Sequence, residues 1–171
     1  MDNFQLDKEY IAGTYNRFPV EIVKGKGSVC FDNNGKKYID LGTGIAVNTF
    51  GFSDDLWVEA VTKQLNFFQH TSNLYYSDPC IKLAKILSER TGCNKVFFSN
   101  SGAEANECAI KAARKYAYLK DGCNDHEIIA MNHSFHGRTM GALSVTGNPK
   151  YREAFEPMIG NIKFADMNDI D

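Results

Sequence analysis

The sequence predicts an α/β fold in which a mostly parallel sheet is flanked by helices. The main observation is a helical stretch, residues 102–120, that lies between two short strand-like apolar runs, 95–98 and 127–131. A long helical connection of this kind joins two strands in parallel with a right-handed crossover. The composition agrees, because 43% hydrophobic and 23% charged residues among 171 are ordinary for a globular chain with its own core.

Composition also narrows the classes of function. A net charge of −2 offers no basic surface for nucleic acid or for an anionic membrane. No apolar run has the length of a membrane span. The first ten residues are acidic and polar, which predicts neither a secretory signal nor a transit peptide. Scattered cysteines without a CxxC pattern predict reduced thiols in a cytoplasmic protein: Cys30, Cys80, Cys93, Cys108 and Cys123.

The N-terminal third contains a predicted antiparallel hairpin. Residues 1–14 have some helical tendency, and residues 19–24 form a short extended run. Residues 29–31 lead into the sequence Asp-Asn-Asn-Gly at 32–35, and residues 37–41 lead out of it. Asn-Gly between two β-prone runs is a strong hairpin signal.

Two glycine-containing segments beside this hairpin fail to match nucleotide-binding motifs. Residues 25–27, Gly-Lys-Gly, lack the spacing of a P-loop, and residues 42–48 lack the third glycine of a dinucleotide fingerprint. The second segment is compatible with a tight turn, and equally with backbone that lies close to a ligand or to another chain.

Two amphipathic helices are expected next. Residues 53–55 cap a helix that runs to about Phe68, and its inward residues share one face: Leu56, Trp57, Ala60, Val61 and Leu65. A polar and aromatic loop, 70–76, precedes a second helix that begins at 77–79 and ends at Gly92. Its expected inner face comprises Cys80, Leu83, Ala84 and Leu87.

The turn at 99–104 has the features of an anion site. Ser101 followed by Glu104 is a capping box, which predicts that the long helix begins here. The first N–H groups of a helix lack internal partners and lie at the positive end of its dipole, and Gly102 permits close approach of a phosphate. An ordinary capped helix is equally compatible with this stretch. A face of small residues predicts close packing on the sheet (Ala105, Cys108, Ala109, Ala112, Ala113, Tyr116 and Ala117), and Glu107 is spaced to pair with Lys111.

The loop at 132–139 follows the strand predicted at 127–131, so it and the turn at 99–104 both leave carboxyl ends of strands and can face one pocket. Three interpretations compete. His133 and His136 could bind a metal, although no further ligand is suitably spaced. Phe135 could simply pack into the core. Alternatively, Phe135 stacks on an aromatic cofactor while Arg138 holds a carboxylate by two parallel hydrogen bonds. A phosphate anchor, a stacking ring and a carboxylate clamp together suit pyridoxal phosphate and an amino acid.

The last part of the chain is less regular. Residues 149–157 predict a short helical turn or loop, and residues 162–165 predict one more strand. A parallel sheet of three such strands without a closing helix is an unfinished layer.

Several segments together resemble the N-terminal part of the class III pyridoxal-phosphate aminotransferases, and most closely their acetylornithine branch. They come in the family's order and spacing: TYNRFPV, VKGKGSVCFDNNGKKYIDLGTGIAVNTFGF, HTSNLYYSDP, FFSNSGAEANECAIKAARKYA, NHSFHGRT and GNPKYREAFEP. SGAEANE and SFHGRT are the specific motifs. The resemblance implies the pyridoxal-phosphate transferase fold of type I. Residues 1–50 would be an N-terminal segment with a hairpin, part of the small domain, and residues 51–171 would be the first part of the cofactor-binding large domain.

The resemblance also implies roles for individual residues. Ser101, Gly102 and Ala103 would bind the cofactor phosphate, and Phe135 would stack on its ring. Arg138 would bind the α-carboxylate of the substrate, and Tyr15 would line the substrate pocket. The loops at 42–48 and 70–77 would lie near the active site at the interface of a homodimer. The implied reaction moves an amino group from N-acetylornithine to 2-oxoglutarate in arginine biosynthesis, without nucleic acid or membrane.

One departure from the family pattern concerns catalysis. The family's chemistry needs a lysine that bonds covalently to the cofactor and moves a proton, together with an acidic partner for the pyridine nitrogen. Both lie C-terminal of Asp171 in the family, so no catalytic residue is expected within this chain, which looks truncated and is expected to be inactive alone. Two alternatives stay open: ornithine, succinylornithine or another ω-amino acid as the donor, and a non-catalytic cofactor-binding fragment that acts by complementation.

Overall fold

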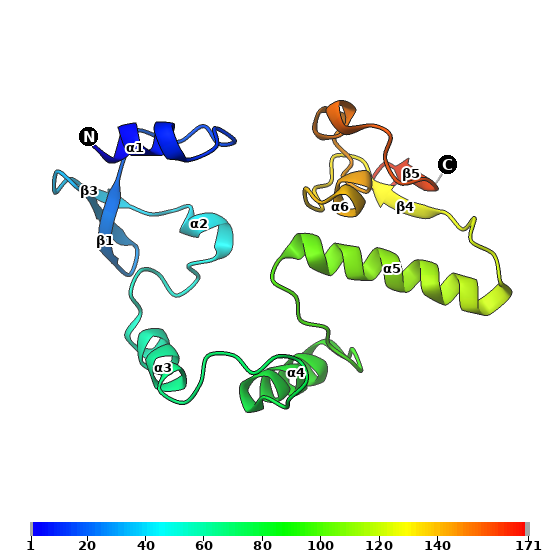
Figure 1. Ribbon diagram of the computed structural model, residues 1–171, viewed down its shortest axis with the longest axis horizontal. Helices are drawn as coiled ribbons and strands as arrows, with labels where there is room; N and C mark the ends of the chain where they lie inside the picture. Colours follow the sequence, from blue (N-terminus) through cyan, green and yellow to red (C-terminus); the bar gives the residue numbers. More distant parts are fainter. Residues whose placement is uncertain (1, 170–171) are drawn as a thin grey trace. The chain divides into compact units, whose positions relative to one another are not determined.

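The computed structural model describes residues 2–169 and divides into two compact units, Met1–Ser77 and Asp78–Asp171. Figure 1 traces the elements of each unit along the chain. The first unit carries helices and an antiparallel sheet, and the second carries the longest helix and a parallel strand pair. The mixed α/β class predicted from the sequence is confirmed.

The first unit is built around a three-stranded antiparallel sheet in the order β1-β2-β3. The strands are β1 (Ile22–Lys26), β2 (Val29–Asp32) and β3 (Lys37–Ile39), and helix α1 (Asn3–Tyr10) precedes them. The Asp2 carboxylate begins α1 by accepting the Gln5 N–H at 2.8 Å. The expected hairpin is present, and the N-terminal stretch with some helical tendency contains α1.

Asp32 organises the turn between β2 and β3. Its Oδ1 accepts the N–H groups of Asn34 and Lys36, each at 2.9 Å, and its Oδ2 accepts the Tyr38 hydroxyl at 2.9 Å. Burial raises the pKa of Asp32, but the hydrogen bonds from Lys36, Tyr38 and Asn34 outweigh it, and the net pKa is lowered. Gly35 supplies the positive φ of 81° that this turn requires.

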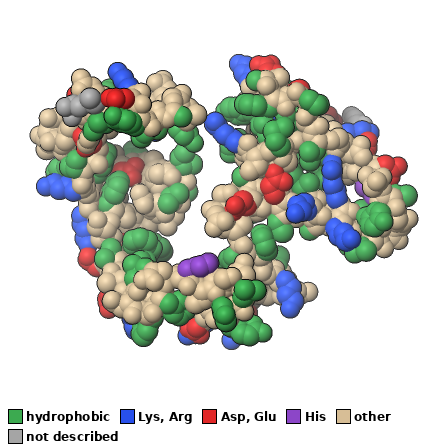
Figure 2. Space-filling model, in the orientation of Figure 1, with side chains coloured by type: hydrophobic (Ala, Val, Ile, Leu, Met, Phe, Trp, Pro, Cys, Tyr) green, Lys and Arg blue, Asp and Glu red, His purple; other side chains and the backbone are tan. Residues whose placement is uncertain are grey.

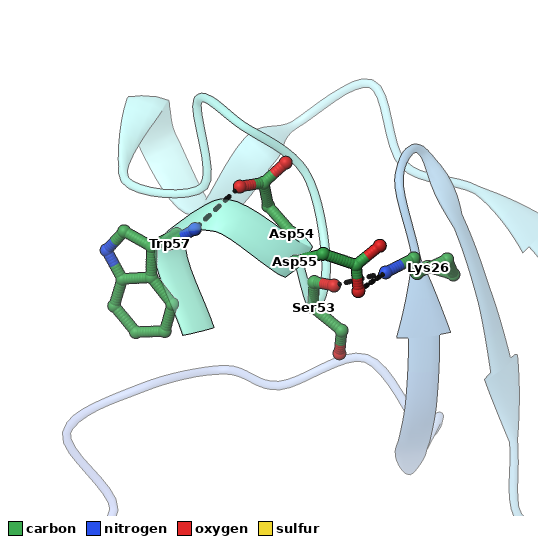
Figure 3. Close-up of polar contacts among 5 residues, drawn as sticks. All are labelled: Lys26, Ser53, Asp54, Asp55 and Trp57. Carbon is green, nitrogen blue, oxygen red and sulfur yellow. Dashed lines mark hydrogen bonds and ion pairs between the residues drawn. The ribbon is translucent and has the colours of Figure 1, made fainter. Parts of the chain in front are cut away.

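A second junction ties the β1–β2 turn to the start of helix α3 (Asp55–Leu65). Gly27 and Phe52 exchange backbone hydrogen bonds at 2.9 and 2.8 Å. Figure 3 shows the Lys26 ammonium beside α3, where it donates to the Ser53 carbonyl at 2.7 Å and pairs with Asp55. Asp54 caps α3 by accepting the Trp57 N–H at 2.9 Å.

The segment between β3 and α3 is a turn of unusual backbone. Its backbone hydrogen bonds define a short helical element, α2 (Thr43–Ala46), yet Gly44 and Ile45 have φ of 60° and 58°. The Asp40 carboxylate holds its start by accepting the N–H groups of Gly42 and Thr43 at 2.9 Å. The tight-turn interpretation describes this local geometry.

Two helices expose the faces that the sequence predicts as inward. Neither α3 nor α4 (Asp78–Thr91) buries a residue; Trp57 on α3 is 55% exposed and Leu83 on α4 is 47% exposed. Figure 2 shows hydrophobic side chains gathered on the surface of both units. The 3.6-residue period identifies the apolar face of a helix, but it does not supply the element that covers it.

The second unit packs helix α5 (Gly102–Asp121) beside a parallel pair, β4 (Ile128–Met131) and β5 (Ile162–Ala165). Between the strands lie α6 (Met140–Ser144) and the 3-10 turns η1 (Pro149–Tyr151) and η2 (Glu153–Phe155). A small core joins α5, β4 and the end of α6 through Ile110, Ala130 and Val145. The expected helix, the strand near 127–131 and the strand at 162–165 are all found.

Two expectations for this unit are wrong. Residues 95–98 form no strand, because within residues 2–169 no neighbouring strand hydrogen-bonds with them, and Phe97 is 65% exposed. The small-residue face of α5 is also uncovered: Ala109 and Ala113 line an open groove beside β4. Ile110 is the buried residue of α5 instead.

Candidate functional site

Helix α5 begins at the predicted Ser101 cap, but Glu104 hydrogen-bonds to a different residue from the one that a capping box requires. Ser101 is the N-cap residue, and its hydroxyl accepts the Glu104 N–H at 3.2 Å. The Glu104 carboxylate does not return to Ser101, as a standard capping box requires; it accepts the N–H of Asn100 at 2.6 Å. The reciprocal half of the box is therefore shifted by one residue, from Ser101 to Asn100.

The donors left at this end fit a phosphate group. Glu104 and Ala105 bond to Ser101, whereas the N–H groups of Gly102 and Ala103 meet no acceptor within residues 2–169. A Cβ placed on Gly102 would meet nothing within 4 Å, so the space beside this backbone is open. Two outward N–H groups and a hydroxyl at the positive end of a 20-residue helix are the donor set that an anion needs.

The loop that carries Phe135 and Arg138 lies against this helix end. A Cβ on Gly137 would lie 2.7 Å from the Cβ of Ala103, so no other residue type fits at this position without displacement. One turn further along α5, Asn106 Nδ2 donates to the His136 carbonyl at 2.7 Å. The structure thus brings the segments at 99–104 and 132–139 together, as expected for two loops that face one pocket.

Phe135 and Arg138 meet on a third residue, Tyr151. The Phe135 ring contacts the Tyr151 ring edge-on, with centroids 6.0 Å apart and an interplanar angle of 79°. The Arg138 guanidinium carbon lies 5.8 Å from the centroid of the same ring. Phe135 is 60% exposed, which excludes the interpretation that it packs into a core of this chain.

Sequence reasoning missed two residues of this region. Tyr151 lies in a stretch predicted only as a helical turn, and nothing in its local pattern signals a ring contact. Glu107 is predicted to pair with Lys111, but its carboxylate instead accepts hydrogen bonds from Thr139, Gly141 and Ala142. The one sequence signal for this contact is the glycine at 141, because a side chain there would collide with the Glu107 carboxylate.

Tyr15, the remaining predicted site residue, belongs to the first unit. It is 68% exposed, and the Arg17 guanidinium lies 5.9 Å from its ring centroid. Arg17 also pairs with Asp7 at 3.3 Å. These residues line a hollow of about 640 Å³ beneath α1.

The metal interpretation of the histidines finds no geometric support. Across residues 2–169, no three His, Cys, Asp or Glu side chains gather as metal ligands would. The same part of the chain contains no helix whose length and apolarity would allow it to cross a membrane.

Comparison with known proteins gives a consistent group of relatives. The profile of a family described as "Aminotransferase class-III" matches residues 10–171. An acetylornithine aminotransferase of Caldanaerobacter subterraneus is 48% identical over 165 residues, which are 96% of this chain and 42% of that protein. One from Methanocaldococcus jannaschii is 48% identical over 166 residues, 97% of this chain and 42% of that protein.

The solved structures that this chain resembles are also aminotransferases. The ornithine aminotransferase of Toxoplasma gondii superimposes with a TM-score of 0.89 at 29% identity, over 97% of this chain and 40% of that one. An ω-transaminase of Pseudomonas jessenii, crystallised in complex with PMP, gives 0.86 at 27% identity, over 98% of this chain and 39% of that one. The chain spans about two fifths of the length of these proteins.

Proposed function

The chain belongs to the class-III aminotransferases, and from this premise we propose that its full-length protein transfers the amino group of N-acetylornithine to 2-oxoglutarate, a step of arginine biosynthesis. Pyridoxal phosphate is the cofactor that the family implies. The contact between Gly137 and Ala103 supports the proposal most directly, because it sets the Arg138 loop against an open helix start.

Each predicted site residue has a proposed role in this reaction. The N–H groups of Gly102 and Ala103 and the hydroxyl of Ser101 hold the phosphate of the cofactor. Phe135 would stack on the cofactor ring, and Arg138 would bind the substrate α-carboxylate through its planar guanidinium. Tyr15 lines the substrate pocket. When bound, the cofactor supplies an electron-withdrawing ring that stabilises negative charge on the carbon bearing the amino group.

These residues anchor the cofactor and orient the substrate, and none of them moves the substrate proton. We propose that the lysine with this task belongs to the remaining three fifths of the relatives' length, so residues 1–171 alone give no turnover. Borohydride treatment in the presence of pyridoxal phosphate tests this, because it fixes a lysine-bound cofactor irreversibly. A single lysine of this chain labelled stoichiometrically would contradict the proposal.

The amino-group donor is the least constrained part of the proposed reaction. Relatives at 43–48% identity carry the acetylornithine name, whereas the Toxoplasma ornithine enzyme is 29% identical, which favours N-acetylornithine. Glutamate formation by the full-length enzyme, measured with N-acetylornithine, ornithine and succinylornithine in turn, distinguishes these donors. A higher kcat/KM for ornithine would transfer the assignment to that reaction.

We further propose a cytoplasmic homodimer, as the family resemblance implies. Sedimentation of the full-length protein checks its mass in solution. A non-catalytic fragment that acts by complementation is the remaining candidate. A reading frame that continues through a lysine-bearing second half would eliminate it.

A further inference from the structure

The Glu107 carboxylate on α5 accepts hydrogen bonds from the start of α6 and none from its own helix. Its Oε1 accepts the Thr139 hydroxyl at 2.5 Å, the Gly141 N–H at 2.9 Å and the Ala142 N–H at 3.2 Å. The last two donors belong to the first turn of α6, whose N-cap residue Thr139 makes no side-chain cap of its own. A carboxylate on α5 therefore caps α6 in place of a residue of α6 itself.

The fit between these elements is close. A Cβ on Gly141 would collide with the carboxylate of Glu107, so the approach of the carboxylate depends on glycine there. Gly137 meets Ala103 in the same way, and Asn106 bonds to the His136 carbonyl.

The residues of α5 that contact the loop of Arg138 share one face of the helix. Ala103, Asn106 and Glu107 are spaced i, i+3 and i+4, and together they fix residues 136–142 from both sides of Arg138. The same Ala103 belongs to the proposed phosphate anchor. One rigid helix consequently sets the separation between the phosphate site and the backbone of the arginine.

We propose that Glu107 is a positioning residue for Arg138, holding the loop so that the guanidinium meets a substrate carboxylate at a fixed place relative to the cofactor phosphate. This inference rests on the proposed function, in which Arg138 binds that carboxylate.

The electrostatics of Glu107 suit this task. The hydrogen bond from Thr139 lowers its pKa; burial opposes the shift, and the N–H groups of Ala142 and Gly141 add to it. The side chain is therefore an ionised acceptor at neutral pH, able to take all three donors at once.

The test uses the full-length, cofactor-loaded enzyme and two binding constants. Calorimetry gives the Kd of 2-oxoglutarate, and the Kd of pyridoxal phosphate is measured on the apo-enzyme. Glu107→Ala should weaken 2-oxoglutarate binding by about tenfold and pyridoxal phosphate binding by less than about threefold, since the hydrogen bonds that are lost hold the arginine loop and not the phosphate donors. Amide exchange of residues 136–142 should accelerate in the same variant.

Conservative variants separate positioning from general damage. Glu107→Gln keeps an acceptor oxygen and should recover most of the affinity, whereas Thr139→Val removes one donor and should weaken 2-oxoglutarate binding alone. Glu89→Gln, on α4, removes an exposed carboxylate paired with Lys85 at 3.7 Å and serves as the matched control. If Glu107→Ala does not fold, Glu107→Gln and Thr139→Val decide by the same measurements.

Two results overturn the proposal: unchanged 2-oxoglutarate affinity in Thr139→Val and Glu107→Ala, or equal losses of both ligands. A wild-type enzyme that binds cofactor but converts no donor would refute the proposed function instead. The exchange of residues 136–142 would still report whether Glu107 holds the loop.

Discussion

The α-carbon of Ala103 lies 3.0 Å from the place where a Cβ on Gly137 would stand. Gly137 also has a φ of 133°, which residues with a side chain rarely adopt. The contact is therefore possible only with glycine, and it joins the start of α5 to the loop of Arg138.

Gly137→Ala should destabilise the full-length protein by about 1–3 kcal/mol, because overpacking and backbone strain act together. Substrate carboxylate binding should weaken as the loop moves away from α5. Urea unfolding and the Kd of 2-oxoglutarate measure the two effects. Gly160→Ala, where a Cβ would meet nothing within 4 Å, is the control and should leave both unchanged.

Ser101→Ala should cost about 1 kcal/mol of stability through the lost N-cap. It should also weaken pyridoxal phosphate binding, because the hydroxyl is one of the proposed phosphate donors. Ser101→Asn preserves capping, so its thermal unfolding should stay close to wild type. Equal cofactor affinity in all three proteins would place the phosphate elsewhere.

Arg138→Ala should chiefly raise the KM for 2-oxoglutarate and leave the cofactor bound. Arg138 is exposed in this chain, and a loss on the order of 2–5 kcal/mol is expected where the bound substrate and the rest of the full-length enzyme bury the pair. Arg138→Lys keeps the charge but loses the planar fork, so it should recover only part of the affinity. Unchanged substrate kinetics in Arg138→Ala would identify this arginine as a solvated surface residue.

The turn at Asp32 predicts a pH dependence of stability. Because its pKa is lowered in the folded state, the carboxylate contributes stability that is fully present above its unfolded pKa of about 3.9. That contribution is lost as the pH falls through the folded pKa. Urea unfolding of wild type and Asp32→Asn should differ at pH 7, and the difference should shrink toward pH 3. A constant difference would contradict this, and the exposed Asp125→Asn should show none.

Local signals in the sequence are sufficient for several elements. Asn34-Gly35 locates the hairpin and Ser101 locates the start of α5, because turns and caps depend on neighbouring residues alone.

Long-range partners are not predictable in the same way. Phe97 and Phe98 have strand propensity, but a strand needs a neighbour with which to hydrogen-bond. Glu107 matches an i, i+4 pair with Lys111, and only the fold shows that Thr139 and Gly141 compete for it. The contact of Tyr151 with Phe135 joins residues 16 positions apart and leaves no periodic trace.

The spacing of Ala103, Asn106 and Glu107 has a consequence for how the family can vary in length. Each residue of an α-helix advances by about 100°, so deleting one residue between Ala103 and Asn106 would turn the later two away from the loop. A substitution within α5 changes one contact at a time, whereas a one-residue insertion or deletion there separates the two halves of the site at once. Changes of length should therefore accumulate after the helix, in the exposed turn at 122–126 that follows its glycine C-cap.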